Sequence, residues 1–181
     1  ILSVFLRINI FISKSLLLKM LFAGVLIALH WITFFKAIKV SNVSITLSVL
    51  SLGAFFTSFL EPFFYKRKII KYEVVLGVIV VIGMSLIFRS QLYYLEGIIY
   101  ALISVFLSVV FALLNGKLIS ESSALVISIY ELLGGVILIS LVLFMIDGFG
   151  ENFFKINDSD MLWLLILCII CTASAYVVFV D

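Results

Sequence analysis

Glu131 is the residue of this chain whose type and position point most directly to chemistry. It lies about two helical turns into an apolar segment, next to Tyr130 and the pair Gly134 and Gly135. An ionisable side chain at that depth in an apolar helix is taken as a functional site by default. The carboxylate could carry a proton coupled to substrate movement, or pair with an amine on the substrate. The alternatives are a structural hydrogen bond to a neighbouring helix and a position near the cytoplasmic interface.

His30, the single histidine, lies beside Trp31 in another apolar segment. It has no partners for a metal site, because no second histidine exists and Cys168 and Cys171 are far along the chain. We expect His30, Trp31 and Phe34 to line a substrate pathway in which the rings offer aromatic faces to a ligand. A hydrogen-bonded packing histidine is the alternative. Although Cys168 and Cys171 have redox spacing, their apolar surroundings favour two small buried hydrophobes.

Small polar residues recur at helical spacing in two segments. The first stripe is predicted to share one helix face and comprises Ser41, Ser44, Ser48, Ser51 and Ser58. The second comprises Tyr100, Ser104, Ser108, Phe111 and Asn115. Such stripes suit close helix packing as well as pore lining. We include Ser48, Ser51 and Asn115 among the candidate pathway residues, although capping or loop bonding explains Asn115 equally well.

The sequence lacks the residue patterns typical of intramembrane enzymes, nucleotide-binding proteins and nucleic-acid-binding proteins. The apolar segments contain no Asp, and His30 has no motif partner, so no nucleophile–base or aspartate pair for an intramembrane enzyme is apparent. No Gly-rich phosphate loop is visible, and no basic patch large enough for nucleic acid remains once the loops are assigned. We therefore expect no enzyme activity, no cofactor, no metal and no nucleic-acid partner.

The elements that carry these residues are long apolar segments. The chain is 65% hydrophobic and only 12% charged, with a mean hydropathy of +1.39, which is far from soluble domains. Helices of bilayer-spanning length are predicted over residues 16–35, 43–65, 69–88, 95–114, 123–146 and 161–180. Residues 1–12 are predicted to be the end of another helix. The chain opens on Ile1 and is interpreted as part of a longer multi-pass membrane protein.

The connectors between these segments predict an orientation. Lys and Arg accumulate on the cytoplasmic side of short connectors. Placing the basic loop 66–71 in the cytoplasm leaves eight basic residues inside: Arg7, Lys14, Lys19, Lys66, Arg67, Lys68, Lys71 and Lys117. The four outside are Lys36, Lys39, Arg89 and Lys155. Glu61, beside the basic loop, is expected to form an ion pair or a helix-end contact, with a gating role as the alternative.

The chain also contains a weak internal repeat at an offset of 145 residues. Four positions in the first copy, Ala28, Trp31, Phe34 and Lys36, match the small, aromatic, aromatic and charged residues Ala173, Tyr176, Phe179 and Asp181. In the predicted topology the two copies cross in opposite directions, as in transporters with inverted repeats. The offset predicts about 50 further residues at each end and a whole protein of roughly 280 residues with ten spans. Tyr176 thereby joins the candidate pathway residues.

Two stretches resemble EamA-type members of the drug/metabolite transporter superfamily. Residues 28–44, ALHWITFFKAIKVSNVS, resemble the third helix and following turn of that family, and residues 172–179, TASAYVVF, resemble its eighth helix. Where many members have a mid-helix Pro and a Gly-Glu pair in the fourth helix, this chain has Gly53 and then Glu61 and Pro62. That departure weakens any transfer of substrate.

The resemblance implies an all-α, polytopic membrane helix bundle with an inverted repeat of five plus five helices, of which about seven are present wholly or in part. Residues 1–88 would hold the end of the first repeat and residues 95–181 the start of the second. It further implies a secondary-active transporter of small metabolites, amino acids or drug-like compounds in the cytoplasmic membrane, with export as the expected direction. A passive channel or a structural membrane bundle is the alternative.

Overall fold

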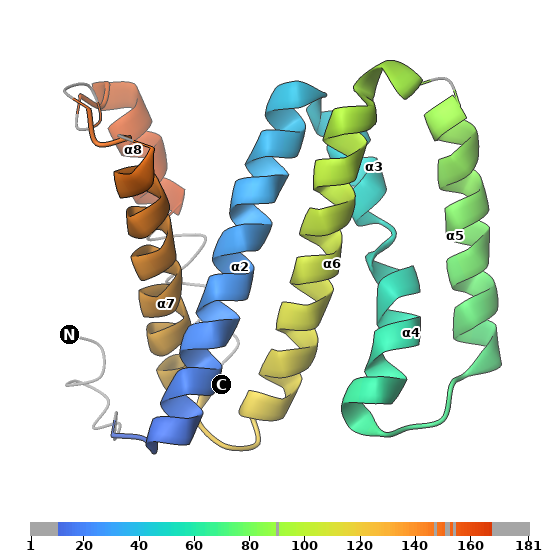
Figure 1. The fold of residues 1–181 in the computed structure, drawn as a ribbon, viewed down its shortest axis with the longest axis horizontal. Coiled ribbons are helices and arrows are strands. Elements are labelled where there is room, and N and C mark those ends of the chain that lie inside the picture. Colours follow the sequence, from blue (N-terminus) through green and yellow to red (C-terminus); the bar gives the residue numbers. More distant parts are fainter. Residues whose placement is uncertain (1–10, 90, 147, 151–152, 154, 168–181) are drawn as a thin grey trace.

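The computed structural model describes residues 11–89, 91–146, 148–150, 153 and 155–167. Within these residues the secondary structure is helical and contains no strand (Figure 1). The elements in chain order are α2 (Lys14–Val40), α3 (Val43–Leu50), α4 (Gly53–Tyr65), α5 (Lys71–Arg89), the short 3-10 helix η1 (Leu92–Tyr94), α6 (Leu95–Leu118), α7 (Ala124–Met145) and α8 (Asp158–Ile166). The all-α prediction is confirmed for the described part of the chain.

Four described segments are long and apolar enough to cross a membrane: Lys14–Val40, Val43–Tyr65, Leu92–Leu118 and Ala124–Met145. They correspond to four of the six predicted spans. The predicted span 69–88 is helical as α5, but it is not one of these four. The beginning of the predicted span 161–180 lies in α8, and its remainder, like most of residues 1–12, lies outside the described residues.

The long helices lie side by side and alternate in direction, which brings their connections to two opposite ends (Figure 1). α2 packs against both α6 and α7, whereas α6 also contacts α3 and α4, and α5 packs on α4. Many apolar side chains point outward, among them those of Val136, Ile137, Leu141 and Phe144 on α7. An outward apolar face of this kind suits contact with lipid tails.

α2 and α7 approach each other through small residues. A Cβ atom added at Gly24 would overlap the backbone carbonyl of Glu131, and one added at Gly134 would overlap the backbone of Leu21. Gly135 faces the carbonyl oxygen of Gly24 and the Cβ of Ala28. Without side chains in between, the two backbones come into direct contact, as small residues allow in membrane helices.

The predicted helix over residues 43–65 is interrupted between α3 and α4. The backbone N–H groups of Ser51 and Leu52 donate to carbonyl groups three residues earlier, at 3.2 and 3.0 Å, so the helix tightens there. The Ser51 hydroxyl donates to the Ser48 carbonyl at 2.6 Å, a local bond that competes with regular helix bonding, and Gly53 follows.

The prediction of one continuous serine face is wrong for this reason. Ser41 is the C-cap of α2 rather than a member of α3. Beyond the interruption, Ser58 is buried whereas Ser51 is exposed. The hydroxyl of Ser58, like that of Ser48, donates to a carbonyl of its own helix, at 2.8 Å in both cases.

Candidate functional site

A cavity of about 380 Å³ lies where the end of α6 meets the beginning of α7. Its walls combine apolar surface with a few polar groups, and none of its lining residues is basic. These residues are Phe111, Asn115, Gly116, Ile119, Ala124, Ile127, Ser128 and Glu131. Ligand sites in proteins have this composition, with a small number of polar groups set in an apolar wall.

Glu131 is the charged group of this cavity and is only 5% exposed. Its Oε1 atom is buried and has no hydrogen-bond partner among the described residues. The side chain of Asn115 interacts with the carboxylate from α6. A buried polar atom without a partner is destabilising and rare in folded proteins. The free Oε1 atom therefore marks a place where a proton or a ligand group would complete the site.

The position of Glu131 is set by its backbone. Its carbonyl packs against Gly24 of α2, so α2 supports this turn of α7 from behind. Ser128 lies one turn earlier on the same face of α7, and its hydroxyl donates to the Ala124 carbonyl at 2.9 Å. At the same end of the molecule, Lys19 pairs with Glu121 at 2.8 Å, with both side chains largely exposed.

His30 lies further along α2, at the interface with α6. Its Nδ1 atom is 2.9 Å from both the carbonyl oxygen and the hydroxyl oxygen of Ser104. The Ser104 hydroxyl also lies 3.2 Å from the His30 carbonyl, to which it donates. Phe34 stacks on the His30 ring with centroids 6.0 Å apart, whereas Trp31 is 38% exposed on another face of α2. In this arrangement His30 joins two helices and does not line the cavity of Glu131.

The remaining candidate residues are dispersed. Tyr130 packs against the buried cluster that α2 forms with α6 and α7. Ser48 lines a different cavity of about 570 Å³ together with Asn42, Ser44 and Gln91. Tyr176, the cysteines Cys168 and Cys171 and the second copy of the internal repeat lie outside the described residues. Of the predicted pathway residues, Asn115 and Glu131 thus meet at one cavity, and His30 and Phe34 are in ring contact away from it.

Sequence reasoning missed Ser128 as a cavity residue. Its spacing of three residues from Glu131 was an available signal, since residues at i and i+3 share a helix face.

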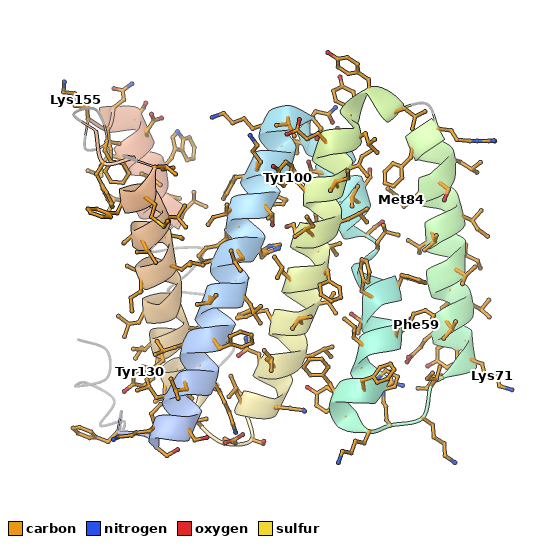
Figure 2. All side chains as sticks on the ribbon, viewed as in Figure 1. Phe59, Lys71, Met84, Tyr100, Tyr130 and Lys155 are labelled. Atoms are coloured by element: carbon orange, nitrogen blue, oxygen red, sulfur yellow. The ribbon has the colours of Figure 1, made fainter. Side chains whose placement is uncertain are left out.

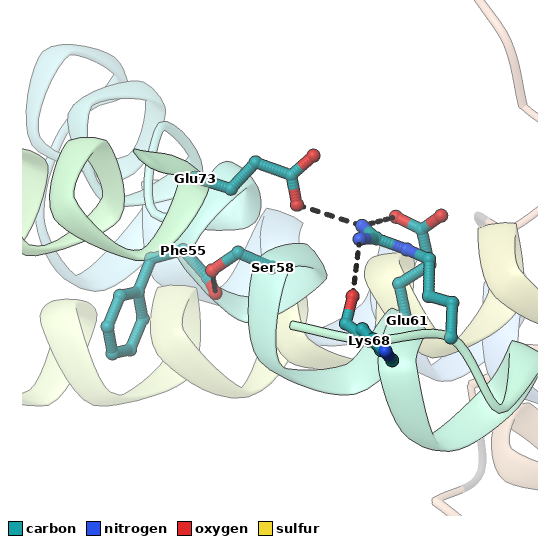
Figure 3. A network of polar contacts seen from close by, with 6 residues as sticks. Phe55, Ser58, Glu61, Lys68 and Glu73 are labelled. Atoms are coloured by element: carbon teal, nitrogen blue, oxygen red, sulfur yellow. Dashed lines mark hydrogen bonds and ion pairs between the residues drawn. The ribbon is translucent and has the colours of Figure 1, made fainter. Parts of the chain in front are cut away.

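The expected ion pair of Glu61 is confirmed, and it includes a second glutamate that was not predicted. One guanidinium nitrogen of Arg67 contacts Glu61 at 2.9 Å and Glu73 at 2.8 Å (Figure 3).

Comparisons with protein-family models, with curated proteins and with solved structures gave no match. In the described part of the chain, no group of three or more His, Cys, Asp or Glu side chains is placed to hold a metal ion. The case for a function therefore rests on the helices and on the cavity around Glu131.

Proposed function

We propose that the protein is a secondary-active membrane transporter of small metabolites, amino acids or drug-like compounds, of the EamA type in the drug/metabolite transporter superfamily. The observation that carries the proposal is the buried Oε1 atom of Glu131, which lines a cavity and has no hydrogen-bond partner among the residues that the structure describes. In an apolar helix a carboxylate of this kind can bind a proton or a cationic substrate group and release it as its surroundings change.

The interrupted helix gives further support. Secondary transporters commonly contain discontinuous helices, and α3 and α4 are separated at Ser51 and Leu52, outside the lining of the Glu131 cavity. The direct backbone contacts of Gly24 and Gly134 bring α2 and α7 close together, as small residues do between membrane helices.

The test is transport by the full-length protein in vesicles. Uptake and efflux of radiolabelled amino acids, nucleosides and cationic dyes would be measured with and without a proton gradient. We expect saturable transport that Glu131→Gln abolishes or uncouples from the gradient. Glu121→Gln is the matched control, because it makes the same chemical change at the same end of the molecule in an exposed ion pair.

Two outcomes of the transport measurements would contradict parts of the proposal. If none of these compounds moves saturably while Glu131→Gln folds normally, the protein is a passive channel or a structural bundle. Equal transport by the parent protein and Glu131→Gln would leave the carrier in place and remove Glu131 from its pathway.

A further inference from the structure

Three basic residues, Lys66, Arg67 and Lys68, lie in the connection between α4 and α5, and a fourth, Lys71, begins α5. Arg67 bridges Glu61 of α4 and Glu73 of α5 through Nη2, and its Nη1 atom donates to the Lys68 carbonyl at 3.3 Å (Figure 3). These bonds with Glu61 and then Glu73 raise the pKa of the Arg67 guanidinium above its already high ordinary value. Arg67 is therefore a permanent cation that compensates one of the two negative charges of Glu61 and Glu73 and joins the two helices.

The other three basic residues point away from this network. Lys66, Lys68 and Lys71 are exposed, and no ion pair within the described residues includes them. Figure 2 shows Lys71 extending away from the bundle. Because Arg67 already occupies both neighbouring glutamates, the charges of these three lysines remain available to a partner outside the protein.

Lys66 has an unusual backbone. It ends α4 with φ 51° and ψ 33°, and it is the one described non-glycine residue with a positive φ. Helices that end in this left-handed conformation usually place glycine there, because a Cβ atom strains it. Here a lysine occupies the position in spite of that strain. A non-glycine residue in a strained backbone conformation is a reason to look for a function of its side chain.

The three lysines follow closely after a candidate membrane span. The candidate membrane span Val43–Tyr65 ends one residue before Lys66. Large apolar or aromatic side chains flank the connection and face outward, with Phe63 79% and Tyr72 65% exposed. Aromatic residues beside lysines are typical of the membrane interface, and basic clusters next to a span attract anionic lipids.

We propose that Lys66, Lys68 and Lys71 form a binding surface for the headgroups of anionic phospholipids, and that Arg67 positions this surface by joining Glu61 to Glu73. The proposal concerns residues that do not line the Glu131 cavity, and it does not depend on transport. It separates two roles within one basic loop: Arg67 faces the protein, and the lysines face the bilayer.

The experiment measures the affinity of the detergent-solubilised full-length protein for phosphatidylglycerol and for phosphatidylcholine by native mass spectrometry. Combining Lys66→Gly, Lys68→Gln and Lys71→Gln should weaken phosphatidylglycerol binding about fivefold for each lysine removed, with no effect on phosphatidylcholine. The control combines Lys36→Gln, Lys39→Gln and Lys155→Gln, which remove equal charge at the opposite end and should leave binding unchanged.

Lys66→Gly by itself separates lipid recognition from folding. Glycine relieves the left-handed backbone, so we expect an unchanged or raised Tm together with weaker phosphatidylglycerol binding. Equal binding by the parent and the triple variant, or an equal loss in the control, would overturn the proposal. Displacement of phosphatidylglycerol by an equal concentration of inorganic phosphate would also overturn it, by assigning the site to free phosphate.

Discussion

His30 and Glu131, two polar residues at helix contacts, differ in their hydrogen bonding. His30 is bonded through Nδ1 to Ser104 on the neighbouring helix, whereas one buried oxygen of Glu131 has no partner within the described part of the chain. The first arrangement stabilises a helix contact, and the second leaves a buried acceptor that a proton or a ligand group could satisfy. The difference favours a structural role for His30 and a functional role for Glu131.

The His30–Ser104 contact can be measured by a double-mutant cycle in unfolding experiments. We expect His30→Leu and Ser104→Ala to show a coupling free energy of about 0.6 kcal/mol, the usual size for interhelical hydrogen bonds in membranes. Thr33→Val replaces His30→Leu in the control cycle, because the Thr33 hydroxyl donates within its own helix. Additive effects of His30→Leu and Ser104→Ala would argue against the bond.

At the scale of the elements, the contact between α2 and α7 determines where Glu131 lies. Gly24 and Gly134 each pack against backbone of the opposite helix, so the separation of the two helices depends on the absence of side chains. The cavity lined by Asn115 and Glu131 is formed by α6 and α7, both of which contact α2. A change in the spacing of α2 would therefore alter the cavity without touching its lining.

Gly24→Ala tests this dependence. The added Cβ would overlap the Glu131 carbonyl, and we expect a loss of about 1–3 kcal/mol in the free energy of unfolding, the usual effect of overpacking. Gly83→Ala is the matched control, because a Cβ there meets nothing within 4 Å. That variant should be neutral, or more stable by up to about 1 kcal/mol through helix propensity. Equal effects of both substitutions would contradict the close contact.

For the whole molecule, alternation of helix direction separates the basic residues into two groups at opposite ends. Lys71 lies at the end where α4 joins α5, and Lys155 lies at the other end (Figure 2). We propose that the end with loop 66–71 faces the cytoplasm, because it carries more of the basic residues.

Labelling of single cysteines from outside the cell checks this orientation. In a background with Cys168 and Cys171 replaced by Ser, a membrane-impermeant maleimide should label Lys155→Cys in intact cells. Lys71→Cys should react only after the membrane is opened. The reverse pattern would invert the proposed orientation, and labelling of both in intact cells would contradict a crossing between them.

The helical class and most helix positions follow from the amino-acid sequence alone. Apolar runs of bilayer length need internal backbone hydrogen bonds, so helices form wherever such runs occur. α5 and α7 accordingly begin and end within two residues of the predicted limits. The depth of Glu131 in its helix followed from the same periodicity.

Which helix faces pack against each other depends on the folded arrangement of the helices. The sequence could not place Ser104 opposite His30 or Gly24 against Glu131, because such pairs depend on how helices far apart in the chain pack together. The interruption at Ser51 and Leu52 was hidden as well, since local hydroxyl bonds and ordinary helix bonds are compatible with the same residues. Packing between helices, rather than the pattern along each helix, therefore made Glu131 and Asn115 neighbours and left His30 outside their cavity.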